Sequence, residues 1–177
     1  MNQTISATIK GTSALLMHAF PMVPVKNPEK LSIEEQAELA AYRDPEGQLF
    51  VPGVALQRCL VNGAGYSKGK GRASLQKVAA ACLEVSPERI LLGKDKWDEI
   101  DTRPVVVPAT KGRVLRHRPR FNQWELSFTL QYDPTLLTED QVRTIVDDSG
   151  TRVGLLDFRP MNRGPYGRFM VISWRRG

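Results

Sequence analysis

The sequence predicts a single α+β domain over residues 1–177, and three observations support this prediction. With 177 residues, of which 41% are hydrophobic, the chain is long enough for one buried core and short for two. Apolar and polar residues alternate over 4–10 and 124–132, which is the period of a half-buried strand. Helix-start signatures of the form Ser/Thr-x-x-Glu/Gln occur at 32–35 and 138–141.

The N-terminal part is expected to contain one strand, two helices and an irregular excursion. Pro52 suits the first turn of a helix, and Gly63 and Gly65 end it. The expected elements, in order, are a strand at 4–10, an apolar stretch at 14–17, an irregular proline-containing stretch at 20–30, a helix from 32 to about 42, a turn at 44–47, an extended piece at 48–51 and a helix at 52–63.

The C-terminal part is expected to contain most of the strands. Gly150 is a natural glycine to end the helix that starts after Thr138. The expected elements, in order, are a flexible cationic loop at 66–72, a helix at 75–82, strands at 90–92, 105–107, 114–118 and 124–132, a helix at 138–150 and a final strand at 169–174.

If two long stretches of the chain are left out, the expected elements follow the order strand, helix, paired strands, helix, strand. That is the βαββαβ pattern of the ferredoxin-like or RNA-recognition-motif architecture. Residues 20–50 and 63–103 are then insertions in the core. They are long for loops, so each is expected to carry structure of its own.

The charge distribution favours a polyanionic partner. The formal net charge is +6, and no acidic residue occurs from 102 to 124, a stretch rich in arginine. The C-terminal segment from 152 to 176 is also basic, with Asp157 as its one acidic residue, whereas most acidic residues lie elsewhere in the chain. Segregated charge of this kind is typical of a protein with a one-sided basic surface that binds nucleic acid.

The loop of residues 154–169 combines glycine, proline, arginine and aromatic residues. Glycines let the backbone approach a ligand with its N–H groups, arginines donate to phosphate, and Phe158, Tyr166 and Phe169 offer rings for base stacking. This combination suits a single-stranded nucleic acid better than a small metabolite. The alternative interpretation is a solvated hairpin loop in front of an ordinary core strand.

Two segments resemble the RAMP (repeat-associated mysterious protein) superfamily, whose members have RNA-recognition-motif-like folds and are best known as CRISPR effector subunits. Residues 51–60 are similar to the family's extended piece, Pro-Gly and helix start. Residues 154–169 are similar to its glycine-rich loop, where Gly164, Pro165, Tyr166, Gly167 and Arg168 match best. The chain departs from the family at Val54 and Ala55, where serine is usual, and at Gln57, where lysine is common.

The resemblance is closest in character to the backbone subunits that coat guide RNA as a filament, in a minimal or phage-borne version. It implies a non-catalytic protein that binds single-stranded RNA, or single-stranded DNA, associates with itself head to tail along the strand and contacts other effector subunits. The expected nucleic-acid-binding residues are Lys68, Lys70, Arg72, Lys111, Arg113, Arg116, Arg118, Arg159, Arg163, Gly164, Tyr166, Gly167 and Arg168.

Two other functions stay open. His117 lies among arginines that would stabilise a cleaving phosphate, so a metal-independent endoribonuclease with His117 as its base is one alternative. A protein-interaction subunit with a basic docking face is the other. His18 is expected to be a core or structural residue, and Asp157 is expected to form a salt bridge with Arg159 or Arg168.

No cofactor or metal is expected. The chain has no Cys-x-x-Cys or His-x-x-x-His motif, and Cys59 and Cys82 are expected to be buried, reduced thiols. No apolar run approaches the length of a membrane span, and the N-terminus does not have the layout of a signal peptide. The sequence therefore predicts a soluble, cytoplasmic protein without a membrane partner.

Overall fold

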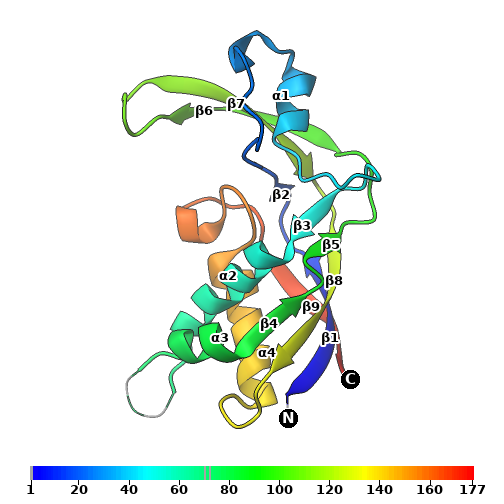
Figure 1. The fold of residues 1–177 in the computed structure, drawn as a ribbon. Coiled ribbons are helices and arrows are strands. Elements are labelled where there is room, and N and C mark those ends of the chain that lie inside the picture. The colour runs from blue at the N-terminus through cyan, green and yellow to red at the C-terminus, as the bar shows by residue number, and fades with distance from the viewer. Residues whose placement is uncertain (1, 70, 72) are drawn as a thin grey trace.

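A four-stranded antiparallel sheet forms the main layer of the protein (Figure 1). The computed structural model describes residues 2–69, 71 and 73–177. The sheet has the order β4 (Leu83–Ser86), β8 (Glu125–Tyr132), β1 (Gln3–Gly11) and β9 (Phe169–Arg176). This arrangement confirms an α+β protein and the strands expected at 4–10, 124–132 and 169–174.

Alternation along the strands separates a buried face of the sheet from an exposed one. Ile5 and Ile9 of β1 are fully buried, as is their neighbour Leu130 of β8, whereas Ser6 and Ser127 face solvent. The buried face packs against α2 (Gly53–Gly63) and α4 (Glu139–Asp148), which also contact each other. The core therefore lies between one face of this sheet and two helices.

Shorter elements connect and extend this core. They are β2 (Leu15–Leu16), α1 (Ile33–Leu39), α3 (Gln76–Cys82), the small two-stranded sheet of β3 (Phe50–Pro52) and β5 (Arg89–Leu91), and the 3₁₀ turns Pro28–Lys30, Ala64–Tyr66 and Pro160–Asn162. Both predicted helix-start signatures are confirmed as capping boxes, with Ser32 before α1 and Thr138 before α4. Within the described residues, no helix is long and apolar enough to cross a membrane.

A long hairpin forms a second sheet away from the main one (Figure 1). Its strands are β6 (Glu99–Val106) and β7 (Arg113–Phe121), and β2 pairs with the base of β7. The strands predicted at 105–107 and 114–118 exist, but they do not join the main sheet, so the predicted insertion at 63–103 is wrong. Core strand β4 lies inside that stretch. The hairpin stays out of the main sheet because β7 carries arginine at alternate positions, and an apolar core cannot cover the face that these arginines form.

The helix predicted at 138–150 does not end at Gly150, so this prediction is also wrong. After α4 the chain continues through a π-helical turn, Ser149–Val153, and the backbone reverses at Gly154, which has a φ of 73°. Gly150 is buried against Phe169, where an added Cβ would lie 2.2 Å from the Phe169 carbonyl oxygen. Gly150 therefore permits a close approach of β9, and the left-handed position that favours glycine falls at Gly154.

Candidate nucleic-acid interface

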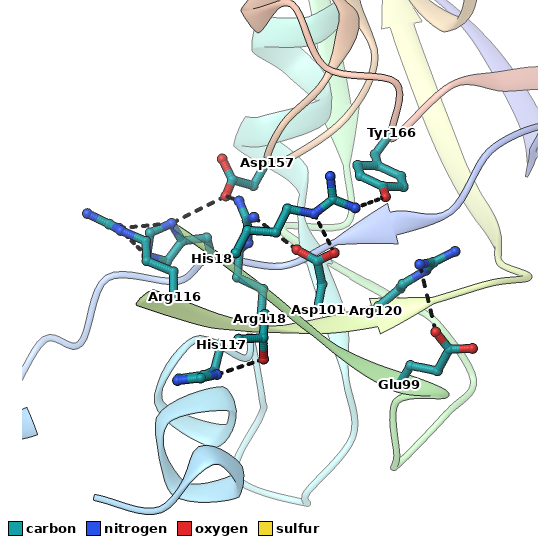
Figure 2. Close-up of polar contacts among 11 residues, drawn as sticks. His18, Glu99, Asp101, Arg116, His117, Arg118, Arg120, Asp157 and Tyr166 are labelled. Atoms are coloured by element: carbon teal, nitrogen blue, oxygen red, sulfur yellow. Dashed lines mark hydrogen bonds and ion pairs between the residues drawn. The ribbon is translucent and has the colours of Figure 1, made fainter. Parts of the chain in front are cut away.

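The hairpin presents a row of arginines to the glycine-rich loop of residues 154–168 (Figure 2). Arg116, Arg118 and Arg120 share one face of β7 because side chains alternate along a strand. Their surroundings differ strongly. Arg118 is buried, whereas Arg116 and Arg120 are half-buried. The three arginines therefore lie in different environments, and the contacts of each are described separately below.

Arg118 is held by two carboxylates at the centre of the row. Its Nη2 lies 2.9 Å from Oδ2 of Asp101, on the neighbouring strand, and its Nη1 lies 2.6 Å from Oδ2 of Asp157, in the loop. With only 4% of its surface exposed, Arg118 has no free guanidinium edge for a phosphate. Arg118 therefore fastens the hairpin to the loop. The salt bridge predicted between Asp157 and Arg159 or Arg168 is wrong, because Arg118 is the partner.

His18 extends this network toward the surface. Nδ1 of His18 lies 3.4 Å from Oδ2 of Asp157, and Nη1 of Arg116 donates to Nε2 of His18 at 2.6 Å. An acceptor at Nε2 assigns the proton to Nδ1, which then points at the carboxylate. Burial favours the neutral form of the Asp157 carboxyl, but hydrogen bonds from His18 and Arg118 outweigh it and hold its pKa well below the ordinary value.

Tyr166 is covered by arginines of the hairpin. The Arg103 and Arg120 guanidinium carbons lie 5.2 Å and 5.6 Å from the centre of its ring, and Arg103 also donates to the Tyr166 hydroxyl. Phe158 packs beside Tyr166, with ring centres 5.9 Å apart. These cation–π contacts brace the loop against the hairpin. Tyr166 thus serves as a clamp between two elements.

Gly164 and Gly167 are buried and make the loop compact. Their N–H groups donate to the carbonyl oxygens of Arg159 and Ala14, at 2.9 Å and 2.8 Å. An added Cβ would lie 1.8 Å from the carbonyl oxygen of Phe158 at Gly164, and 2.1 Å from that of Leu155 at Gly167. Both glycines allow close backbone packing, and neither N–H group points to a ligand.

The remaining predicted cations fall at three separate places. Lys111 and Arg113 are exposed near the tip of the hairpin, and Lys68 is exposed beyond α2. The loop contributes exposed Arg163 and Arg168, together with half-buried Arg159. Arg168 donates to the Thr151 carbonyl and Arg159 to the Leu156 carbonyl, each through Nη1. Lys70 and Arg72 lie outside the described residues.

A groove of about 420 Å³ lies between the start of α2 and the loop. The polar and charged side chains that line it are those of His18, Arg58, Asp157, Arg159 and Asn162, and Tyr42 adds an aromatic ring. Val54 and Arg58 line it from one face of α2, since they are four residues apart. The groove brings together cationic donors from two segments that are a hundred residues apart in the sequence, Arg58 and Arg159.

Sequence reasoning missed Arg58, Asn162 and the surface role of His18. Arg58 had a usable signal, because it lies within the Pro-Gly helix motif and on the face opposite buried Leu56 and Cys59. His18 had none, because its apolar neighbours suggested the core. Its 31% exposed side chain reaches the groove only through the fold.

His117, the candidate base, lies on the other face of β7 from Arg116 and Arg118 (Figure 2). It is 9% exposed, and its Nδ1 lies 2.8 Å from the Thr102 hydroxyl. His117 therefore faces neither the arginine row nor the groove.

Within the described residues, no group of three or more His, Cys, Asp or Glu side chains could hold a metal ion. Cys59 is buried, which raises the pKa of its thiol to about 12, and Cys82 is half-buried. Comparison of the sequence with protein-family models and with curated proteins finds no match.

Proposed function

We propose that this protein binds single-stranded nucleic acid without cleaving it, with RNA as the expected ligand, and that its core is a ferredoxin-like, RNA-recognition-motif-like domain of the RAMP type. The sheet order β4-β8-β1-β9 supports the fold assignment. It corresponds to βαββαβ connectivity, with α2 between the first and second core strands and α4 between the third and last.

One observation carries the binding proposal, namely the groove between α2 and the loop. Arg58, Arg159 and Asn162 supply donors of the kind that contact phosphate and ribose oxygens. Tyr42 and Val54 give the same groove an apolar side, and the positive end of the α2 dipole favours an anion there. Exposed Arg163 lies on the same loop and extends the basic surface beyond the groove.

The mode of binding is proposed to be coating of the strand by successive copies, joined by other effector subunits. Cations on the hairpin, on the loop and beyond α2 are spread over the length of the molecule, which suits a ligand that passes along it (Figure 1). A small ligand would need them to converge on one point.

Titration of a labelled single strand with the protein, followed by fluorescence anisotropy, tests the proposal. Arg58→Ala and Arg159→Ala should each weaken binding about tenfold, since a charge-assisted contact contributes on the order of 1.5 kcal/mol. Arg143→Ala is the matched control, because it removes the same charge from the outer side of α4. Equal affinities of all four proteins would remove the groove from the binding surface.

A second candidate function, metal-independent RNA cleavage, is favoured by the contact between His18 and Asp157. A carboxylate that orients a histidine is an arrangement used for general-base catalysis, and Nε2 of His18 would act as the base once Arg116 turns from it to a phosphate. The candidate base is thus His18 in place of His117. Cleavage of RNA in the presence of a chelator that is lost in His18→Ala but kept in His117→Ala would support it. Intact RNA after long incubation with the unaltered protein would exclude it.

A further inference from the structure

A small pocket lies beside the C-terminal end of α2 and the turn Pro160–Asn162 of the loop, and we name it the Tyr66 pocket. It encloses about 210 Å³ and is lined by Asn62, Gly65, Tyr66, Gln76, Val153 and Met161. A pocket for a whole small-molecule ligand usually measures about 300–1,000 Å³, so this one suits a single part of a larger ligand. Its lining carries no charge at neutral pH, which favours an uncharged group over an ion.

Tyr66 gives the pocket an exposed aromatic ring that is held in position. The guanidinium carbon of Arg152 lies 4.9 Å from the centre of this ring, and Nε of Arg152 lies 2.9 Å from Oδ1 of Asp148. Tyr66 nevertheless stays 51% exposed. An aromatic side chain fixed in this way is a platform on which any nucleobase can stack, because every base has a π-face.

Two amide side chains lie in the same pocket as the ring. Nε2 of Gln76 donates to Oδ1 of Asn62 at 3.4 Å, and within the described residues the other amide atoms, Nδ2 of Asn62 and Oε1 of Gln76, make no hydrogen bond. A free donor and a free acceptor complement the edge of a nucleobase, and Asn and Gln are residues that read bases in this way. The pocket therefore combines the two kinds of contact that a base in a single strand makes.

The Tyr66 pocket adjoins the groove between α2 and the loop. Arg58 lines the groove and Asn62 lines the pocket, and these two residues lie one turn apart on the same face of α2. From the loop, Asn162 lines the groove and its neighbour Met161 lines the pocket. A strand with its phosphates in the groove can therefore place a base in the pocket.

We propose that the Tyr66 pocket receives one nucleobase of the bound strand, which stacks on Tyr66 and is held at its edge by Asn62 and Gln76. This inference rests on the proposed function and deepens it by naming where a base is contacted. The groove acts through charge, whereas the pocket is uncharged. Loss of a pocket contact should therefore weaken binding without changing its salt dependence, unlike loss of an arginine in the groove.

Anisotropy titrations of a labelled single strand at several salt concentrations test the pocket. Tyr66→Leu removes the ring. Gly65→Leu should fill the pocket while every contacting side chain is kept, since a Cβ at Gly65 would meet nothing closer than the Gln76 side-chain oxygen, at 3.9 Å. Each variant should bind at least about fivefold more weakly, which is the loss expected for one stacked base. The slope of log K against log salt concentration should stay that of the unaltered protein.

Phe20→Leu is the matched control, because Phe20 is an 84% exposed aromatic residue outside the pocket. It should bind like the unaltered protein. Photocrosslinking of the unaltered protein to a strand that contains iodouridine then shows where the bases lie. Mass spectrometry of the crosslinked peptides should find the attachment at Tyr66 or Met161, and Gly65→Leu should abolish it.

The outcomes separate this inference from the proposed function. A strand that fails to bind even at low salt would overturn both. Salt-dependent binding would leave the proposed function in place. The base pocket alone would then be overturned if Tyr66→Leu and Gly65→Leu bind like the unaltered protein, if Phe20→Leu weakens binding equally, or if all crosslinks lie outside the pocket.

Discussion

Arg118 shows how a cation that looks suited to phosphate serves the fold instead. Its guanidinium is buried between Asp101 and Asp157, which come from another strand and from the loop. Arg118→Ala leaves both carboxylates without this partner, and the free energy of unfolding should fall by roughly 3 kcal/mol. Urea denaturation measures the change. Arg113→Ala, exposed on the same strand, should cost less than about 0.5 kcal/mol, and equal costs would contradict this role.

Asp157 should make part of the stability depend on pH. Its lowered pKa in the folded state means that the folded protein binds fewer protons at this carboxyl than the unfolded chain does. The resulting stabilisation is present above the unfolded pKa, about 3.9, and is lost as the pH falls from there toward the folded value. Asp157→Asn should therefore be less stable than the unaltered protein near neutral pH.

Urea denaturation of both proteins from about pH 7 down to about pH 3 measures this difference. The gap in unfolding free energy should narrow below about pH 4, because the carboxyl of the unfolded chain then carries its proton. A gap that is constant across this range would show that Asp157 stabilises the fold by packing alone.

The period of a strand indicates which side chains share a face but not what lies opposite them. The two-residue period of β7 groups Arg116 with Arg118. Whether each arginine is exposed to solvent or paired with a carboxylate depends on the positions of Asp101 and Asp157. The local sequence around the arginines does not give these positions. Local patterns therefore indicated the loop and the helix start that line the groove, but not the partner of each arginine.

At the scale of elements, the contact of α2 with α4 depends on glycine at the end of α2. A Cβ at Gly63 would lie 1.9 Å from Oγ of Ser149 and 2.9 Å from the Ile145 carbonyl oxygen. Gly63→Ala should therefore destabilise the protein by about 2 kcal/mol, although alanine favours a helix. Thermal or urea unfolding measures this effect.

Gly65→Ala is the control for this change, because its Cβ would meet nothing closer than 3.9 Å, the side-chain oxygen of Gln76. Its effect on stability should be small. A stabilising Gly63→Ala would mean that the two helices separate easily, and the close packing of α2 on the turn after α4 would then lose its structural importance.

The long elements were predictable because their signals are local. Capping boxes fix the starts of α1 and α4, and alternation identifies β1 and β8. Leu83–Ser86 gave no such signal, since four residues directly after a helix are too few to show a period. The membership of β4 in the main sheet is decided by its pairing with β8, between residues more than forty positions apart.

At the scale of the whole molecule, long-range pairing again escapes the local pattern, and for this reason the sequence predicted the hairpin strands as part of the core. Its strands were recognised, but which sheet a strand joins depends on what can cover its faces. One face of β7 holds Arg116, Arg118 and Arg120, and their partners are His18, the carboxylates of Glu99, Asp101 and Asp157, and the ring of Tyr166. The hairpin therefore stands apart from the main sheet, and the ion pair of Arg118 with Asp157 joins it to the loop.

The net charge of +6 and its segregation make salt dependence the broadest test of the binding proposal. Each phosphate that the protein neutralises on a single strand should contribute about −0.7 to the slope of log K against log salt concentration. Arg58→Ala combined with Arg159→Ala should make the slope less negative by about 1.4, if both contact phosphate. Arg143→Ala should leave the slope unchanged. Anisotropy titrations at several salt concentrations give the slopes. Parallel lines for all three proteins would mean that neither Arg58 nor Arg159 neutralises a phosphate of the strand.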